Sequence, residues 1–248
     1  MSAIAFNAAP RPYPRELALV TLGASLAAIA GALLAASYPG QGWVWLHWFG
    51  KPLATALIFV LAWRAQPAQS PRYRRWILLG IACSLLGDVL LMLPGDLFVP
   101  GLVAFLLGHL CFITAFLGDS GFAARPFLLL ASLGYGAVNL SLLWPSIGAP
   151  LRVPVMVYVV VLACMGGQAL VRARIFALRG DAQAPAARLA ALGALMFMLS
   201  DSLLAWNRFH GAIPLASLWV LSAYYLALWW IARSVQRDDT MVEAEAAT

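Results

Sequence analysis

The chain has 248 residues, of which 63% are hydrophobic and only 10% are charged, and its formal net charge is +6. Soluble domains carry about 25% charged residues, so this composition excludes an ordinary water-soluble domain. Several apolar runs reach the roughly 20 residues that cross about 30 Å of hydrocarbon. The sequence therefore predicts an all-α polytopic membrane protein.

The placement of basic residues and cysteines, and the motifs that are missing, argue against nucleic-acid binding and against a metal or phosphate-loop site. Basic residues lie in short loops between apolar runs, which is typical of membrane topology and not of nucleic-acid binding. The three cysteines, Cys83, Cys111 and Cys164, lie inside apolar runs without the spacing of a zinc site or a disulfide framework. The chain also shows no HExxH motif and no Gly-rich phosphate loop. We therefore expect no metal, no cofactor and no nucleic acid, and the sequence indicates no protein partner.

Eight transmembrane helices in one bundle, residues 15–234, are expected between a short polar lead, residues 1–14, and a mobile polar tail, residues 235–248. The first apolar run is too long for the core of a signal peptide, so we expect it to be retained. The basic segments 66–75 and 172–188 are expected to be loops. In chain order the helices are expected at about residues 17–38, 52–63 (with an earlier start in the Trp-rich segment 42–49 as an alternative), 76–93, 97–117, 126–144, 153–171, 189–206 and 214–232.

The basic residues also predict the orientation of the chain. Most of the sixteen lie on the side of the N-terminus, and Lys51, Arg152 and Arg208 lie on the other side. Positive charge favours the cytoplasm, so we expect both termini there. Arginine far outnumbers lysine, which is typical of a GC-rich bacterial genome, so the predicted location is a bacterial inner membrane.

Two carboxylates inside apolar helices, Asp88 and Asp201, are the strongest functional signal. An acid near the middle of a membrane helix costs roughly 3 kcal/mol on insertion scales, so such residues usually face a polar cavity. Each lies thirteen residues beyond an arginine, Arg75 or Arg188, which places both about 20 Å from the cytoplasmic boundary. Equal depth predicts a shared site. The similar segments around the acids also fit a 4+4 parallel repeat, with chance similarity between Leu-rich helices as the alternative.

Few other polar side chains lie deep in the predicted helices. Ser84 precedes Asp88 by about one turn and so shares its face. His109 is either a hydrogen-bonded structural residue or part of the site. The small and aromatic residues around it, within 101–112, favour close packing against a neighbouring helix.

Lys51, Asn207 and Arg208 lie toward the outer surface of the membrane. They are either ligands of a polar group above the acids or ordinary interface residues that reach toward water. Tyr224 and Tyr225, in the last helix, either bond to the acids or only pack.

Several motifs together resemble the YhhN-like lysoplasmalogenase family. They occur in the expected order from Lys51 to Trp230: K-P at 51–52, G-D-V-L-L-M at 87–92, G-L-V-A-F-L-L-G-H at 101–109, S-D-S-L-L-A-W-N-R-F at 200–209 and A-Y-Y-L-A at 223–227. The resemblance implies eight membrane helices and hydrolysis of the vinyl-ether bond of lysoplasmalogens. The products would be a fatty aldehyde and glycerophosphoethanolamine or glycerophosphocholine. Asp88 and Asp201 would be the catalytic acids.

The chemistry of a vinyl ether suits a pair of carboxylates. Protonation of the β-carbon creates an oxocarbenium cation, so the site needs a proton donor, a negative charge and a base for water. Two acids close together do not both ionise easily, so one is expected to stay protonated. Two other classes stay open: a proton-coupled transporter with Asp88, His109 and Asp201 as a relay, and a structural protein whose acids only hold helices together.

The shape of a lysoplasmalogen predicts how it would bind. Its chain is expected to run down among the helices, and its phosphate is expected to stay near the outer surface. Arg208 or Lys51 would hold the phosphate, and Ser84, His109, Asn207 and Tyr225 are the other candidate substrate-binding residues.

Overall fold

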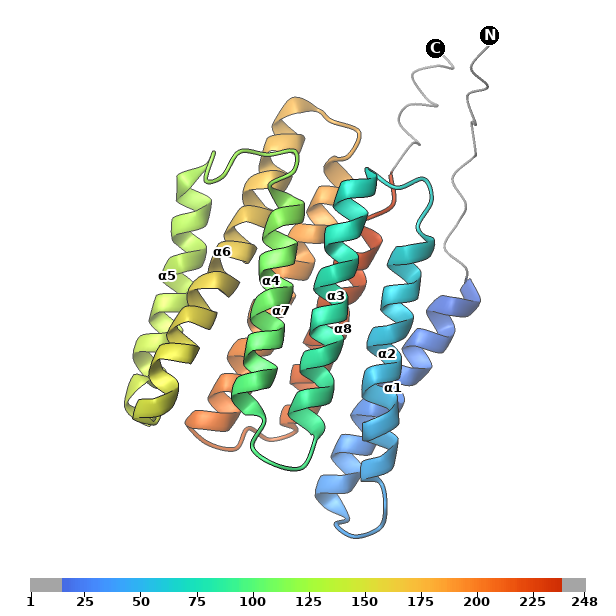
Figure 1. Ribbon diagram of the computed structural model, residues 1–248, viewed down its shortest axis with the longest axis vertical. Coiled ribbons are helices and arrows are strands. Elements are labelled where there is room, and N and C mark those ends of the chain that lie inside the picture. The colour runs from blue at the N-terminus through green and yellow to red at the C-terminus, as the bar shows by residue number, and fades with distance from the viewer. Residues whose placement is uncertain (1–14, 238–248) are drawn as a thin grey trace.

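The predicted transmembrane segments are α-helices in the computed structural model, which describes residues 15–237 (Figure 1). The all-α prediction is confirmed, and within residues 15–237 the only β pairing is a single bridge between Ala68 and Gln236. The predicted lead and residues 238–248 of the predicted tail lie outside the described residues. The elements are α1 (Arg15–Ser37), α2 (Val44–Arg64), α3 (Pro71–Met92), α4 (Phe98–Phe116), α5 (Pro126–Leu143), the short 3-10 helix η1 (Trp144–Ser146), α6 (Ala149–Arg179), α7 (Ala184–Phe209) and α8 (Ala216–Arg233).

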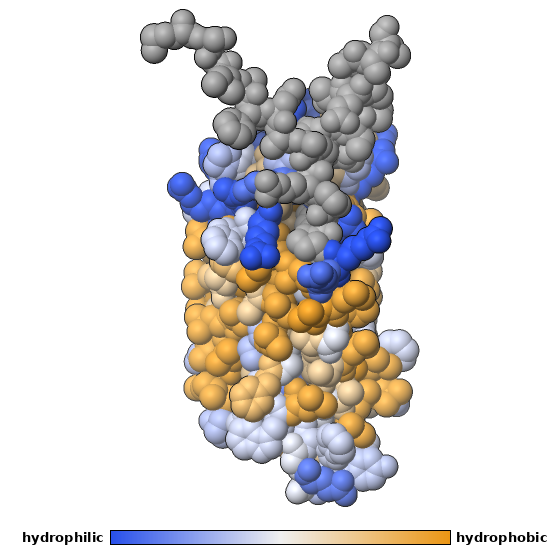
Figure 2. Space-filling model, turned by 90° about the vertical axis from the view of Figure 1, so that its right-hand side faces the viewer, coloured by the Kyte–Doolittle hydropathy of each residue, from blue (hydrophilic) through white to orange (hydrophobic). Residues whose placement is uncertain are grey.

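The outside of the bundle is apolar over most of its height. Within residues 15–237, seven helices, α1 to α7, are long and apolar enough to cross a membrane, and α8 packs along α7. Figure 2 shows a broad hydrophobic belt between two more polar ends. Large side chains lie on this surface; Phe127, for example, is 78% exposed. An apolar surface of this extent is stable in lipid and not in water, so the chain is an integral membrane protein.

Six helices form two rows, and α5 and α6 lie at one side of them. In Figure 1, α2, α3 and α4 lie in front of α1, α8 and α7. α6 packs against both α4 and α7, and α5 packs mainly against α6, which leaves α5 as the outermost helix on that side. α1 begins and α8 ends at the same end of the bundle, together with Arg64, Arg74, Arg179 and Arg188. We call this the basic end, and the opposite end the distal end.

Close packing of α3 on α4 fixes the position of the first acid. A Cβ at Gly87 would lie 2.6 Å from the Phe105 ring, and one at Gly108 would lie 3.0 Å from the carbonyl oxygen of Gly80. Any larger side chain there would push the helices apart. The prediction that residues 101–112 pack closely on a neighbour is therefore confirmed. The 4+4 repeat stays a prediction.

The predicted loop at 172–188 is wrong over most of its length. α6 continues to Arg179 and ends at Gly180, whose φ of +63° suits the left-handed conformation that terminates helices. α7 begins at Ala184, so the connection is short. The helix continues past the first predicted loop residue because Arg172 need not leave the bundle: it is fully buried, and aromatic rings and polar side chains surround it. Other bounds differ less. α2 starts at Val44, so the alternative start within 42–49 is confirmed. The predicted loop at 66–75 is wrong over its second half, because α3 starts at Pro71.

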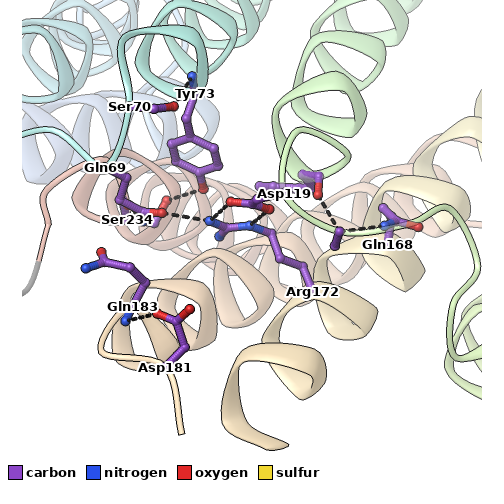
Figure 3. A network of polar contacts seen from close by, with 11 residues as sticks. Gln69, Ser70, Tyr73, Asp119, Gln168, Arg172, Asp181, Gln183 and Ser234 are labelled. Atoms are coloured by element: carbon purple, nitrogen blue, oxygen red, sulfur yellow. Dashed lines mark hydrogen bonds and ion pairs between the residues drawn. The ribbon is translucent and has the colours of Figure 1, made fainter. Parts of the chain in front are cut away.

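Arg172 is the centre of a buried polar cluster near the basic end (Figure 3). Its Nε and Nη2 donate to the two carboxylate oxygens of Asp119, each at 2.7 Å, and Nη2 also donates to Gln69 at 2.7 Å. The guanidinium lies 4.6 Å from the centre of the Tyr73 ring and 4.7 Å from that of Phe176. A bidentate carboxylate and two aromatic faces suit a guanidinium that is withdrawn from water. We call these residues the Arg172 cluster.

The Arg172 cluster also holds the end of α8 in place. Gln69 donates to the carbonyl oxygen of Ser234, and the hydroxyl of Tyr73 lies 2.8 Å from that of Ser234. The backbone nitrogen of Arg237 donates to the carbonyl oxygen of Pro67 at 2.8 Å. The first residues of the predicted tail are thus joined to the α2–α3 loop.

Candidate active site

A cavity of about 290 Å³ lies in the distal half of the bundle. Residues from seven helices, α2 to α8, form its wall, which is mostly apolar. Asp88 of α3 and Asp201 of α7 both lie on this wall, although 113 positions separate them in the chain. Lys51, Asn207 and Arg208 line the cavity as well. The fold therefore brings most of the predicted site residues to one space inside the membrane-embedded part of the molecule.

Asp88 is buried and surrounded by groups that donate to it. Its Oδ1 lies 3.3 Å from the Nζ of Lys51. Its Oδ2 accepts hydrogen bonds from Thr55 at 2.8 Å and from Tyr224 at 2.6 Å. An ammonium group has no acceptor, so the arrangement fits an ionised carboxylate whose charge Lys51 balances. Thr55 follows Lys51 by one turn of α2, so a single helix supplies two of the three partners.

Asp201 has different neighbours and keeps contact with the cavity. Its side chain is 14% exposed, whereas that of Asp88 is 1% exposed. Its Oδ2 accepts a short hydrogen bond from the hydroxyl of Tyr158 on α6. The Nε2 of His109 lies 3.0 Å from the same hydroxyl and 3.7 Å from Oδ2. Among the described residues, neither lysine nor arginine pairs with Asp201. No lysine or arginine therefore balances its charge as Lys51 balances that of Asp88.

An aromatic ring separates the two acid networks. Phe197 is fully buried, and its ring centre lies 4.7 Å from that of His109 and 5.5 Å from that of Tyr224. Both contacts are nearly perpendicular, as expected for edge-to-face packing. His109 belongs to the Asp201 network and Tyr224 to the Asp88 network, so Phe197 packs against one ring from each network.

The predicted residues at the distal mouth form local contacts. The Nη2 of Arg208 lies 3.3 Å from the Oδ1 of Asp96. The Cζ of the same guanidinium lies 3.9 Å from the centre of the Phe98 ring. The side-chain oxygen of Asn207 accepts from the backbone nitrogen of Ile213 at 2.9 Å. Lys51 does not lie beside Arg208 at the mouth but beside Asp88, where the whole residue is 9% exposed. Arg208 is therefore the more accessible of the two predicted phosphate ligands.

Three predicted residues are not on the cavity wall. Ser84 is fully buried and donates to the carbonyl oxygen of Gly80 at 3.0 Å, within the α3–α4 contact. Tyr225 is buried, and its hydroxyl has no hydrogen-bond partner among the described residues. His109 lies behind Tyr158, and its Nδ1 is likewise without a partner there. Of the two tyrosines considered, Tyr224 bonds to an acid and Tyr225 packs.

Two residues of the site were missed. Thr55 could have been found, because it lies one turn from Lys51 and so on the same face of a helix. Tyr158 is the single hydroxyl in the run V-P-V-M-V-Y-V-V-V, and nothing in its spacing points to Asp201. Within residues 15–237, no three His, Cys, Asp or Glu side chains are grouped so as to hold a metal ion.

The YhhN family model matches residues 46–235, which include the whole cavity and the Arg172 cluster. The human protein named lysoplasmalogenase TMEM86B is 33% identical over 197 residues, which cover 78% of each chain. A lysoplasmalogenase of Mycobacterium bovis is 38% identical over 145 residues, covering 56% of this chain and 51% of its own. The Escherichia coli membrane protein YhhN is 36% identical over 112 residues, 44% of this chain and 50% of its own.

No solved structure matches the fold of this chain. The family model nevertheless covers well over half of the sequence, and the matched span contains both acids and every side chain that bonds to them. The chain belongs to the YhhN family.

Proposed function

We propose that this protein is an intramembrane hydrolase that cleaves the vinyl-ether bond of lysoplasmalogens. Its products would be a fatty aldehyde and glycerophosphoethanolamine or glycerophosphocholine. The observation that carries the proposal is the placing of two carboxylates, Asp88 and Asp201, on the wall of one mostly apolar cavity. Relatives that are named lysoplasmalogenases support the choice of substrate.

The different surroundings of the acids support different roles in the reaction. Asp201 borders the cavity without a lysine or arginine partner, so we assign it the proton that is transferred to the β-carbon of the vinyl ether. This step forms a C–H bond and leaves an oxocarbenium cation at the carbon bonded to oxygen. Asp88 stays ionised beside Lys51, and its negative charge stabilises the cation.

Water completes the reaction and restores the site. A water molecule adds to the cationic carbon and loses a proton to the Asp201 carboxylate, which returns Asp201 to its starting state. The product is a hemiacetal, which splits as its hydroxyl proton moves to the glycerol oxygen. Aldehyde and glycerol phosphodiester leave without any cofactor in the balance. Tyr158 and His109, which bond to Asp201 in series, hold its carboxyl group toward the cavity.

The transporter alternative requires a continuous relay through Asp88, His109 and Asp201. His109 and Asp201 are joined through Tyr158. Among the described residues no hydrogen bond joins Asp88 to His109, and Phe197 lies between their networks. We therefore favour the hydrolase.

We further propose that the protein lies in a bacterial inner membrane with its basic end in the cytoplasm, so that the cavity opens toward the outer leaflet. The clustering of arginines at the basic end supports this orientation. Single cysteines at positions 95 and 179, in a background without Cys83, Cys111 and Cys164, test it in intact cells. A membrane-impermeant reagent should label position 95. Labelling of position 179 alone would reverse the orientation.

Turnover of a defined substrate tests the function. The detergent-solubilised protein is incubated with an alkenyl glycerophosphoethanolamine, and the release of aldehyde is measured. The same lipid with a saturated alkyl ether is the matched control, since it has no β-carbon that can be protonated to an oxocarbenium ion. We expect aldehyde from the first lipid only, and a slower reaction in D2O because a proton is transferred to carbon. The absence of aldehyde would overturn the proposal.

A further inference from the structure

The cavity is small for a ligand with a long hydrocarbon chain. Its volume of about 290 Å³ is near the lower limit of ligand pockets, which span about 300–1,000 Å³. The glycerol and the vinyl ether of the substrate must fit in this space, beside the two carboxylates on its wall. If the substrate is the single-chain lipid of the proposed function, most of its hydrocarbon chain must lie elsewhere.

The hydrocarbon chain of the substrate cannot continue from the cavity toward the basic end of the bundle. Among the wall residues of α4, α6, α7 and α8, those nearest the basic end of the bundle are Phe105, Ala163, Met198 and Tyr224. Below them the core is filled by fully buried side chains, Phe112, Phe197 and Met165 among them. Protein interiors of this kind have few voids larger than a water molecule. The expected path down among the helices is therefore closed about one turn below the acids.

A seam between α5 and α7 offers another exit. α5 is the outermost helix and packs mainly against α6 (Figure 1). Below the acids the seam is shut, because Ser132 of α5 contacts Met198 of α7 and donates to the carbonyl oxygen of Ala163 at 2.8 Å. At the level of the cavity, two hydrogen bonds between side chains cross it. Tyr135 bonds to Ser202 at 2.9 Å, and Trp206 donates to Asn139 at 3.0 Å.

The residues at this seam face the cavity and the membrane at once. Tyr135 lines the cavity and is also 43% exposed on the outside of the bundle. Ser202 lines the cavity and directly follows Asp201. Gly136, Asn139 and Leu140 continue the cavity wall along the same side of α5. The wall between the catalytic carboxylate and lipid is thus one side chain thick.

We propose that the α5–α7 seam is a lateral portal through which the hydrocarbon chain of the substrate leaves the cavity for the bilayer. The portal is defined by Tyr135, Asn139, Ser202 and Trp206, and it opens when the two hydrogen bonds between them break. This proposal rests on the proposed function in one respect, because it takes the hydrocarbon chain to be that of a lysolipid substrate. The polar head then stays at the distal mouth, near Arg208.

A reversible bridge across the seam tests the portal. Tyr135→Cys and Ser202→Cys are combined in a background without Cys83, Cys111 and Cys164, and a short bifunctional methanethiosulfonate reagent joins them through disulfides. Activity is measured on a long-chain lysoplasmalogen and on an analogue whose alkenyl chain has four carbons. Bridging should lower turnover of the long-chain lipid at least tenfold while the short analogue is still cleaved, and reduction should restore the loss. The same protein after reduction, and each single-cysteine variant after the same treatment, are the controls.

The comparison between the long-chain lipid and the short analogue decides whether the hydrocarbon chain uses the portal. If the bridge leaves both substrates unaffected, or abolishes cleavage of both, the chain does not use this seam and the proposal is overturned. A second variant, Asn139→Ala, removes one crossing hydrogen bond and should raise kcat/KM for the long-chain lipid relative to the short analogue. An equal change for both substrates would also count against the portal.

A binding measurement separates failure of the portal from failure of the proposed function. A bimane label is attached at Tyr135→Cys, or as a matched control at Leu86→Cys on the exposed face of α3. A non-hydrolysable alkyl lysophospholipid with a brominated chain is then titrated in. Saturable quenching several-fold greater at position 135 supports the portal even if the protein cleaves no vinyl ether. Equal, non-saturating quenching at both positions would overturn it.

Discussion

Buried charges occur in two regions of this protein, and their surroundings differ. In the Arg172 cluster the guanidinium is fully buried, bound by both oxygens of Asp119 and enclosed by two aromatic rings. In the candidate active site Asp201 borders an open cavity and accepts a hydrogen bond from Tyr158. A charge in filled surroundings cannot reach a ligand, so it holds segments together. A charge beside open space can exchange a proton with a substrate.

The two regions also differ in what they connect. The Arg172 cluster joins loops and helix ends, namely the α2–α3 loop, the α4–α5 loop, α6 and the end of α8. The candidate active site joins the middle parts of helices that are already packed together. Loss of the first should therefore affect stability, and loss of the second should affect turnover.

The largest effect is expected from the acids. Asp201→Asn and Asp88→Asn keep the shape of the side chain but remove its ability to hold or lose a proton. Turnover of the vinyl ether should fall at least about a hundredfold in each, as for loss of an acid–base group. The thermal midpoint in detergent should change little in Asp201→Asn, because a neutral amide costs less to bury than a charge. It should fall in Asp88→Asn, although the protein still folds, because Lys51 loses its buried partner. Near-normal turnover in either variant would assign that acid to structure.

The second prediction concerns the Arg172 cluster. Arg172→Leu removes a bidentate ion pair and two cation–π contacts, which should lower the free energy of unfolding by about 2–3 kcal/mol. For a chain of this size the thermal midpoint should fall by roughly 5–10 °C. Arg174→Leu, at an exposed position two residues away, is the matched control and should have little effect. Lost turnover with an unchanged midpoint would place Arg172 in the chemistry instead.

The third prediction concerns the pairing of Lys51 with Asp88. Lys51→Met removes the cation that balances Asp88, so turnover should fall about tenfold or more while the protein still folds. The double variant with Asp88→Asn should be no slower than Asp88→Asn alone, because the two side chains act as one unit. Additive losses in this double-mutant cycle would show that Lys51 acts independently, for example on the phosphate.

The smallest effect is expected at the distal mouth. Arg208→Gln should raise KM a few-fold with little change in kcat, because a phosphate contact is similar in the ground state and the transition state. Arg152→Gln is the matched control, since Arg152 is also distal but donates to the carbonyl oxygen of Ile147 and lies over Trp144. A structure with the lipid head group beside Arg74 or Arg179 would contradict this arrangement.

Some features of the protein follow from the sequence alone. The eight helices, their approximate bounds and the membrane class follow from the lengths of apolar runs, because the thickness of the hydrocarbon core sets those lengths. The importance of Asp88 and Asp201 follows from the cost of placing an acid in such a run. Both inferences depend on local composition, which a single chain displays directly.

Tertiary structure alone decided which groups surround each acid. Tyr224 lies 136 positions from Asp88, and Tyr158 lies 43 positions from Asp201. No local pattern encodes such pairings, because they depend on how α2, α6 and α8 are rotated in the bundle. The same holds for Arg172, which hydropathy assigns to a loop although Tyr73, Asp119 and Phe176 enclose it after folding. Charge, burial and open space come together only when distant helices pack, and their combination distinguishes the two candidate catalytic carboxylates from a structural ion pair.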